Sequence, residues 1–465
     1  NLHWYANVDY NYMNRYFATV SLSAEANSRF GKKAGGLDLC GVAWALFPSV
    51  QLGWVMTNEK WFPKTGAINY LRLNAGFDMS GNDDISNYAA RTSLSAVRFN
   101  YNAIGLQLTN IGNDEIKWET SRKFNVGLQS FLVNNRIGVD FNFYINKTSD
   151  LLTLKTFDNP IGGINNYWTN GGELQNCGFE LTFTGKPVVS RLWNIELGAT
   201  VGHYSNEVKK LPDGDYTTSI YGDNNILTAV GKPVGLFYGY QTAGVFADDN
   251  EARSAGKDGY LYMEDNAGQR NNFVAGDVHF IDRNNDGIIN DLDKTVIGDP
   301  NPDIYGNIFA TVSFRDFTLT MGWNYSLGND VYNYQRSILN SGSTFYNQQV
   351  AEVSHWRYEG QQTAYPRLAY GDPLGNNRFS DRWIEDGSYL RLKTLNLSYK
   401  VPVPGSWTWL QGLTIWAEAE NLLTFTKYCG SDPEFSIGNG VLYQGIDCGN
   451  LAQGRSFSCG VKINL

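Results

Sequence analysis

The chain has 465 residues, a net charge of −9 and an aromatic composition, with 13 Trp, 28 Tyr and 25 Phe. No stretch reaches the roughly 18 apolar residues that a membrane-spanning helix needs, and the acidic balance argues against nucleic acid as a partner. Abundant Tyr, Trp, Gly and Asn without long apolar runs is typical of membrane β-barrels, in which lipid-facing and lumen-facing residues alternate. The five cysteines form no CxxC pair, so zinc and redox motifs have no support.

Alternation of apolar and polar residues is the dominant pattern from the start of the chain. Residues 3–12 and 16–25 alternate around a short turn at Met13-Asn14, which predicts a hairpin with one apolar and one wet face. The clearest pair spans residues 123–146, with a tight turn at Asn134-Asn135. Its apolar set is Phe124, Val126, Leu128, Ile137, Val139, Phe141, Phe143 and Ile145.

The same alternation continues to the C-terminus, in residues 179–183, 193–201, 308–323, 413–420 and 456–465. It breaks between Leu392 and Leu395, which predicts a β-bulge. We expect about fourteen to fifteen strands, each long enough for the roughly 9–11 residues of a membrane strand. Charges such as Asp140 and Glu418 fall on the polar face, where a watery lumen tolerates them.

Three long polar loops separate the later strands, at residues 203–303, 326–386 and 426–453. The first contains only a short strand-like piece near Leu236–Phe246. So long an irregular connection is normally functional or disordered. A soluble β-sandwich could produce the same alternation. Short turns on one side and long, extracellular loops on the other favour an all-β fold, a transmembrane antiparallel β-barrel.

The first long loop contains a candidate metal site, because residues 282–293 (DRNNDGIINDLD) follow the twelve-residue calcium-loop pattern. Gly287 takes the turn position, and Asp293 stands where Glu is usual, so its reach is shorter. The flanks are not amphipathic helices, which indicates a lone loop. The alternative is a polar loop that folds through its own side-chain hydrogen bonds. The predicted Ca²⁺ ligands are Asp282, Asn284, Asp286, the carbonyl of Ile288, Asn290 and Asp293.

The same stretch carries a family resemblance. Residues 282–289, followed by Asp293 and by IGDPNP at 297–302, resemble the signature loop of SusC/RagA-type TonB-dependent outer-membrane transporters. Further segments are similar to that family in the family's order, namely YFATVSLSAEANSRF (16–30), FPSVQLGW (47–54), GLFYGYQTAGVF (235–246), IEDGSYLRLKTLNLSY (384–399) and WAEAENLLTFTKY (416–428). The matches run from near residue 1 to the C-terminus.

The resemblance implies a fold and a function. Such transporters hold an N-terminal plug in a barrel of roughly 22 strands, and residues 1–465 resemble the C-terminal part of that barrel. The plug, the TonB-contacting segment and the first strands are absent from the sequence, so a separate chain or segment is expected to supply them and to meet the TonB complex. The implied role is uptake of oligosaccharides or oligopeptides across the outer membrane of a Gram-negative, Bacteroidetes-like bacterium, with a SusD-like surface lipoprotein as the lid.

Two alternatives belong to other functional classes. One is an outer-membrane barrel enzyme, which four dispersed histidines and the lack of a nucleophile motif disfavour. The other is a structural or adhesive barrel without energised transport. The sequence assigns no residue to substrate. Four loop aromatics could stack on sugar rings, but packing or contact with the lipoprotein are equally good interpretations; they are Tyr238, Tyr240, Trp356 and Tyr370.

Two cysteines of the last loop, Cys429 and Cys448, are predicted to form a disulfide, because they lie on the side where oxidised pairs persist. Two free thiols are the alternative, since spacing does not fix connectivity. Cys459 falls on the predicted lipid face and is expected to stay free.

Overall fold

The structure is a computed structural model that describes residues 1–39, 41–63, 66–100, 103–222, 225–257, 259–264, 269–404, 409–435, 437–438 and 440–464. Cys40 and Leu465 therefore lie outside the described residues. The described part contains two short α-helices, α1 (Asp249–Ser254) and α2 (Tyr334–Leu339), and is otherwise mostly strand. No helix in it has the length and apolar character to cross a membrane.

The chain divides into two compact units. The first comprises Asn1–Gly214 with Ala229–Lys232 and Ile308–Arg315. The second comprises Asp215–Thr228, Pro233–Asn307 and Asp316–Leu465.

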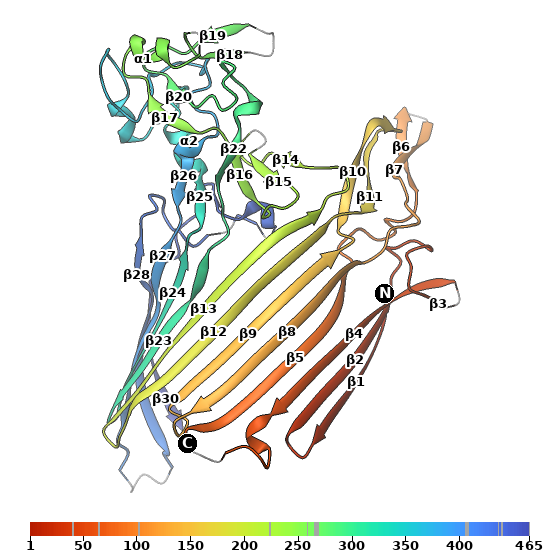
Figure 1. The fold of residues 1–465 in the computed structure, drawn as a ribbon, viewed down its shortest axis with the longest axis vertical. Coiled ribbons are helices and arrows are strands. Elements are labelled where there is room, and N and C mark those ends of the chain that lie inside the picture. The colour runs from red at the N-terminus through yellow and green to blue at the C-terminus, as the bar shows by residue number, and fades with distance from the viewer. Residues whose placement is uncertain are drawn as a thin grey trace. The chain divides into compact units, whose positions relative to one another are not determined.

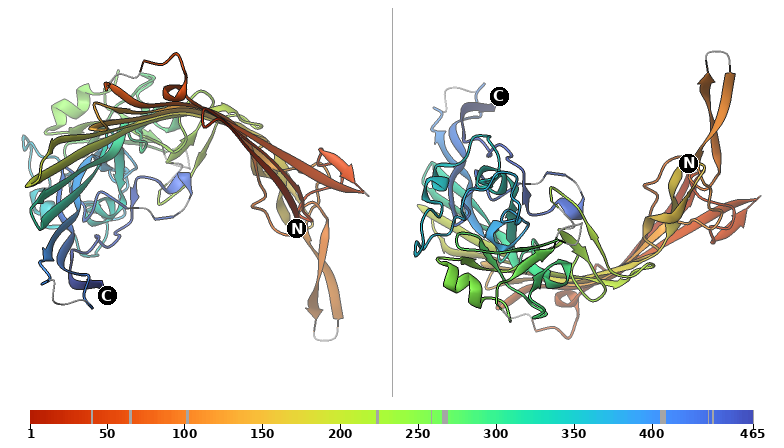
Figure 2. Two further views of the ribbon diagram at one scale, coloured as in Figure 1. Left: turned by 90° about the horizontal axis from the view of Figure 1, so that it is seen from below. Right: turned by 90° about the horizontal axis from the view of Figure 1, so that it is seen from above.

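The main sheet of the described residues has 14 strands in the order β1-β2-β4-β5-β8-β9-β12-β13-β23-β24-β27-β28-β30, with β3 beside β4 (Figure 1). The first unit contains β1 (Leu2–Tyr12), β2 (Tyr16–Ala26), β3 (Leu37–Leu39), β4 (Val42–Val55), β5 (Ile68–Asn82), β8 (Glu119–Leu132), β9 (Ile137–Ser149), β12 (Glu173–Val189) and β13 (Trp193–Lys210). The second contains β24 (Phe317–Leu327), β27 (Tyr389–Val401), β28 (Gly412–Thr426) and β30 (Ser456–Asn464), while β23 (Ile304–Phe314) is divided between them. Neighbours follow chain order, and this confirms the all-β architecture. Figure 2 shows the first unit's strands as a twisted, curved sheet.

The strand register gathers apolar side chains on one face. Phe143 of β9 lies opposite Val126 of β8 and opposite Phe179 of β12. Many residues of this face are exposed, namely Val20, Leu22, Leu52, Phe77, Phe124, Val126, Phe141, Leu181, Phe183 and Leu197. A continuous exposed apolar face is what a lipid-facing surface requires.

The opposite face is polar, and its side chains form hydrogen bonds between strands. Gln51 of β4 donates to Asp78 of β5 at 2.7 Å, and Asn396 of β27 donates to Glu418 of β28 at 2.7 Å. Other pairs on this face are Thr19 with Asp9, Ser21 with Asn7, Ser121 with Asn146 and Ser456 with Glu420. These polar groups solvate one another on the face that the sequence predicts to be wet.

Aromatic rings mark the end of the first unit where the strand connections are short. Tyr12, Tyr16, Trp54 and Trp61 form a row with neighbouring ring centroids 6.3–6.4 Å apart. Further pairs at this end are Tyr70 with Phe131 and Trp193 with Phe314. Tyr and Trp favour the boundary between lipid and water, and girdles of aromatic residues flank the lipid band of outer-membrane barrels.

The predicted bulge is confirmed in β27. Leu392 pairs with Trp323 of β24 and Thr394 pairs with Gly322, so Lys393 is an extra residue opposite that strand. The ammonium group of Lys393 contacts Glu434 at 3.3 Å and Gln453 at 2.6 Å. The bulge therefore aims a cation at the last long loop, a use that bulges often have.

The long connections contain more regular structure than the sequence indicates. β13 continues to Lys210, so the predicted boundary of the first loop at residue 203 was wrong. After Val201, β13 continues through a polar stretch that lacks the regular apolar alternation by which a strand is recognised in a sequence. Sequence reasoning also missed two hairpins of the first unit, β6 (Ser93–Asn100) with β7 (Ala103–Asn110), and β10 (Leu152–Ile161) with β11 (Ile164–Asn170).

The described residues of the second unit's loops form four small sheets. Their strands are β14 (Tyr216–Thr218), β15 (Ile226–Thr228), β16 (Leu236–Gly239) and β22 (Thr295–Gly298); β17 (Thr242–Val245) and β20 (Val278–Phe280); β18 (Tyr262–Glu264), β19 (Arg270–Asn272) and β21 (Ile288–Ile289); and β25 (Asp330–Asn333), β26 (Ile384–Asp386) and β29 (Ile446–Asp447). The described 3₁₀ turns are η1 (Met56–Asn58), η2 (Asp291–Asp293), η3 (Val350–Ser354), η4 (Asp381–Trp383) and η5 (Val441–Tyr443).

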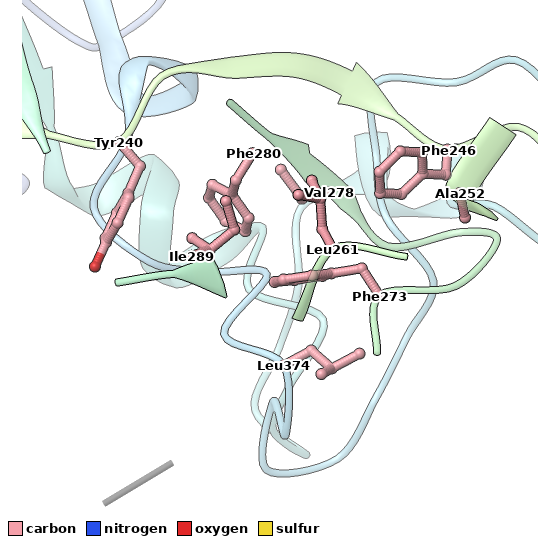
Figure 3. Packing of buried hydrophobic residues seen from close by; sticks show 9 residues of the cluster. All are labelled: Tyr240, Phe246, Ala252, Leu261, Phe273, Val278, Phe280, Ile289 and Leu374. Atoms are coloured by element: carbon pink, nitrogen blue, oxygen red, sulfur yellow. The ribbon is translucent and has the colours of Figure 1, made fainter. Parts of the chain in front are cut away.

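A buried apolar cluster supports these loops. Figure 3 shows Val278, Phe280 and Leu261 at its centre, with Tyr240 at one edge and Phe246 beside Ala252 at the other. The ring of Tyr240 contacts that of Phe280 edge-on at 5.6 Å, and its hydroxyl points away from the cluster (Figure 3). The first long loop thus has a core of its own, which anchors the site described next.

Candidate functional site

The predicted metal loop lies between β20 and β22 and turns sharply at its centre. Asn285 and Gly287 have positive φ values of 57° and 83°. The second is the left-handed conformation that glycine adopts without strain. This turn folds the loop so that the side chains of the first three predicted ligands, Asp282, Asn284 and Asp286, lie next to the same short segment of backbone.

Side chains of the loop hold its backbone in place. Asp282 Oδ2 accepts from the Gly287 N–H at 2.7 Å, and Asp286 Oδ1 accepts from the Ile288 N–H at 2.8 Å. Asn284 Oδ1 accepts from the Asp286 N–H at 3.0 Å. These bonds are the local turns that Asp and Asn favour, and they are the ones that the non-metal interpretation expects.

The last two predicted side-chain ligands, Asn290 and Asp293, lie at η2. Asp293 is fully buried, and its two carboxylate oxygens accept from the N–H groups of Arg283 and Asn290, each at 2.9 Å. Asn290 Oδ1 accepts from the Leu292 N–H at 2.8 Å, so the pair forms a capping box. Asp293 thereby joins the two ends of the loop.

The donor set suits a hard cation, since six oxygen-bearing residues lie on one closed loop. Among the described residues, however, no group of three or more His, Cys, Asp or Glu side chains is gathered in a metal-binding cluster. The carboxylates are held by backbone N–H groups instead. Calcium binding by this loop stays a prediction.

A pocket of about 890 Å³ lies beside the loop, within the second unit. One side is formed by η2 and its flanks, and the others by α2 and by the segment before η4. Its lining is rich in tyrosine and comprises Tyr221, Gly222, Tyr240, Glu264, Ile289, Asn290, Asp291, Leu292, Lys294, Tyr332, Tyr334, Ser337, Ile338, Asn377, Arg378 and Phe379. Binding pockets for small ligands have this volume, with a few placed polar groups.

Charged side chains pack against the ring of Tyr240 and pair with one another. Lys294 Nζ and Arg378 Cζ lie 5.5 Å and 5.4 Å from the centre of its ring. Burial raises the pKa of the Tyr240 hydroxyl to about 12. Lys294 also forms an ion pair with Asp291 at 2.9 Å, and this hydrogen-bonded contact lowers the pKa of Asp291. Tyr240 therefore stays neutral and Asp291 stays negatively charged at neutral pH.

Sequence reasoning named two residues of this pocket, Tyr240 as an aromatic that could stack on sugar and Asn290 as a calcium ligand. The other proposed sugar-stacking candidates do not line it. The indole N–H of Trp356 donates to the Ala247 carbonyl at 3.0 Å, and Tyr370 stacks on Phe345 at 4.8 Å. The remaining lining residues come from segments far apart in the chain, so no local sequence signal could have grouped them.

The predicted disulfide is not formed, because Cys429 and Cys448 are both free thiols. The sulfur of Cys448 lies 3.7 Å from Asn450 Oδ1, and its electrostatic interaction with the Tyr221 hydroxyl raises the pKa of that hydroxyl. The sulfur of Cys429 lies 3.8 Å from the Lys427 carbonyl and is exposed. Each thiol has a local polar partner, which corrects the prediction from loop position alone. Cys459 is exposed on β30 and free.

Comparison with known proteins gives consistent matches. Residues 2–422 match the family described as TonB dependent receptor-like, beta-barrel. TonB-dependent receptor P3 of Formosa agariphila is 29% identical over 99% of this chain and 45% of its own length. TonB-dependent receptor SusC of Bacteroides thetaiotaomicron is 25% identical over 99% of this chain and 43% of its own length.

Solved structures share the fold. The RagAB peptide importer in its closed-closed state superposes with a TM-score of 0.79 at 23% identity, over 99% of this chain and 47% of that one. The chain therefore spans less than half the length of these relatives. The resemblance to SusC/RagA-type transporters is confirmed, and the chain belongs to the family of TonB-dependent receptor-like β-barrels.

Proposed function

We propose that this chain forms the C-terminal part of the barrel of a SusC-type importer, which takes up oligosaccharides or oligopeptides across the outer membrane of a Gram-negative bacterium. The observation that carries the proposal is the family match over residues 2–422, on a sheet with one exposed apolar and one polar face. A plug, the first strands and the contact with the TonB complex would come from a segment or chain outside these residues.

A SusD-like lipoprotein lid is part of the proposal. The loop between β24 and β27 exposes several large side chains with apolar surface, and two of them, Phe345 and Tyr370, stack on each other. Their exposed fractions are 90% for Phe345, 79% for Tyr346, 84% for Val350, 66% for Tyr358 and 75% for Tyr370. Aromatic residues are enriched in protein interfaces. These exposed side chains therefore favour the binding of a partner protein by the loops of the second unit.

We also propose that the loop at residues 282–293 binds Ca²⁺. Asp282, Asn284, Asp286, the Ile288 carbonyl, Asn290 and Asp293 would hold it. A bound Ca²⁺ would offset two of the three carboxylate charges on this loop and stabilise a segment with a small core. Its role would be structural.

Transport is favoured over an outer-membrane enzyme or an adhesive barrel by the family match. Deleting the gene in its native host, then feeding mixed oligosaccharides and mixed oligopeptides with and without a proton-gradient uncoupler, tests this. We expect one class of nutrient to lose uptake on deletion and in the presence of uncoupler. Uptake unchanged by the deletion, or a protein that fractionates away from the outer membrane, would contradict the proposal.

A further inference from the structure

We propose that the first unit binds the phosphate-bearing headgroup of an outer-leaflet lipid, at a row of cations that borders its exposed apolar face. Such a site goes beyond nutrient import and depends only on the apolar face being the one that meets lipid. We call this row the cationic rim, and it comprises Arg122 of β8, Lys147 of β9, Glu173 of β12, and Glu207, Lys209 and Lys210 of β13. Its position, its excess charge and the apolar surface beside it point to this ligand.

Arg122 stands where the exposed apolar face ends. Residues two apart in a strand share a face, so Arg122 continues the face of Phe124 and Val126, which are 47% and 39% exposed. The short turn at residues 133–136 joins β8 to β9 at the ends far from Arg122, whereas the long connection of residues 150–172 leaves β9 at the same end as Arg122. In outer-membrane barrels the long connections are extracellular. Arg122 therefore borders the outer leaflet.

The register of the strands extends this border across the sheet. Arg122 lies opposite Lys147 of β9, and Lys147 lies opposite Gln175 of β12. In the next row of the same face, Glu173 lies opposite Lys210 of β13. The four strands β8, β9, β12 and β13 are consecutive neighbours in the main sheet (Figure 1). The charged side chains thus form one continuous border.

The rim has two more cations than acids. Glu173 pairs with Lys147 at 2.6 Å, and Glu207 pairs with Lys209 at 2.7 Å. Among the residues that the structure describes, the other two cations of the rim form no ion pair; both are exposed, and their charges act on Glu173 without a hydrogen bond. The rim therefore carries an excess of positive charge, although the whole chain has a net charge of −9.

This excess charge is placed where an anion would relieve a repulsion. Arg122 and Lys147 lie directly opposite each other on antiparallel strands, and like charges in that position destabilise a sheet. Glu173 contacts only one of the two, Lys147. A guanidinium and an ammonium both donate charge-assisted hydrogen bonds to phosphate oxygens. A phosphate group bound between the two side chains would offset their repulsion.

The surroundings of the rim favour a lipid over a soluble anion. A lipid joins a phosphate-bearing headgroup to acyl chains, just as the rim adjoins exposed apolar side chains such as Phe124 and Phe141. Beyond the rim, toward the long connections, the cations of the first unit are paired. Lys117 contacts Asp150 at 3.0 Å, and Lys155 contacts Asp213 at 2.6 Å. The excess charge thus lies at the level of the headgroups, where basic residues attract anionic lipids.

Two substitutions remove the cations of the rim that form no ion pair. Arg122→Gln and Lys210→Gln each replace an exposed charge by a neutral polar side chain. The matched control is Lys123→Gln, at the neighbouring exposed cation of β8. Lys123 lies opposite Asp78 and Asn146 and belongs to the polar face. The control therefore loses the same charge from the other side of the sheet.

The measurement is native mass spectrometry of the purified full-length transporter in a neutral detergent, titrated with monophosphoryl lipid A. The same lipid without its phosphate reports binding through acyl chains, and inorganic phosphate reports a site for soluble anions. We expect monophosphoryl lipid A to bind about fivefold more weakly to either single variant and about thirtyfold more weakly to the double variant. Lys123→Gln should bind it like the original protein, and the lipid without phosphate should bind as weakly as monophosphoryl lipid A binds to the double variant.

Equal affinity of the double variant and the original protein, equal weakening by Lys123→Gln, or no preference for the phosphorylated lipid would overturn the inference. Inorganic phosphate bound at the rim as tightly as the lipid would overturn the assignment to a lipid. A heat-dependent shift in electrophoretic mobility checks that each variant is folded. Arg122→Lys keeps the charge and should retain most of the binding, whereas a loss as large as that of Arg122→Gln would contradict a role for the charge.

Discussion

The carboxylate of Asp277 accepts two hydrogen bonds from the guanidinium of Arg367, at 2.8 Å and 3.1 Å, across ninety positions of sequence. Asp277 is fully buried and also accepts from the Asn376 side chain at 2.9 Å and from the Val274 N–H at 2.9 Å. A buried carboxylate is stable only when its oxygens are satisfied in this way. The pair joins the first and second long loops within the second unit.

Arg367→Ala should loosen that junction. The substitution leaves a buried carboxylate without its cation. We expect the free energy of unfolding of the loops to fall by about 2 kcal/mol, which is less than for a fully buried ion pair because Arg367 is partly exposed. Hydrogen exchange of residues 240–280 measures the effect as faster exchange. The control is Arg270→Ala, which breaks the exposed pair with Glu264 and should change little. Equal effects of both variants would contradict this account.

Spin labels at neighbouring positions of β9 should report opposite environments. Val139 lies opposite Phe183 of β12, whereas Asp140 lies opposite Gln129 of β8 and Thr182 of β12. A label at Val139 should be accessible to oxygen in lipid, and a label at Asp140 to a water-soluble nickel chelate. Labels at Phe141 and Asn142 should repeat the alternation. The same environment at Val139 and Asp140 would refute the two-faced sheet.

The second long loop should become less stable as the pH rises. Burial raises the pKa of the Glu352 carboxyl to about 7 from its ordinary value of 4.5. The folded loop keeps this proton at pH values where the unfolded chain has released it. The free energy of unfolding therefore falls between these two pKa values and levels off above them.

Glu352→Gln should remove that pH dependence and raise stability at about pH 8 relative to the original chain. Thermal unfolding and hydrogen exchange of residues 340–382 at about pH 5 and about pH 8 provide the comparison. The exposed acid in Glu359→Gln serves as the control. If the pH dependence of stability survives in Glu352→Gln, a titrating group other than Glu352 causes it.

Calcium should protect the loop at residues 282–293 from proteolysis, with the protection lost on chelation. Asp286→Ala should abolish this difference, because it removes one of three carboxylates of the predicted ligand set. Asp213→Ala, at an exposed carboxylate of the first unit, should leave it unchanged. Cleavage rates that are identical with calcium and with chelator would favour a loop closed by its own hydrogen bonds.

Cys429 and Cys448 should be alkylated separately in the non-reduced protein, as their free state in the structure indicates. Cys429 is exposed and should react faster than Cys448, which is partly buried and contacts Asn450 and Tyr221. Mass spectrometry of non-reduced peptides separates the two outcomes. A linked peptide containing both cysteines would restore the disulfide predicted from the sequence.

The sequence by itself determined most strands of the main sheet, their two faces and the bulge. Alternation in residues such as 137–145 is a local property, because successive side chains of a strand point to opposite faces. The break near Leu392 is local for the same reason. The loop at 282–293 could be recognised as a candidate calcium loop because its predicted ligands all lie within twelve consecutive residues.

Only the tertiary structure decided which loop residues meet. The Asp277–Arg367 pair, the direction of the Cys448 thiol and the pocket at Tyr240 depend on contacts between distant segments. Polar loops lack a hydrophobic period that would fix their register. Their geometry comes instead from a small core, in which Phe246, Phe273 and Phe280 are buried to 1% exposure or less, and from hydrogen bonds that satisfy buried polar groups once that core has formed.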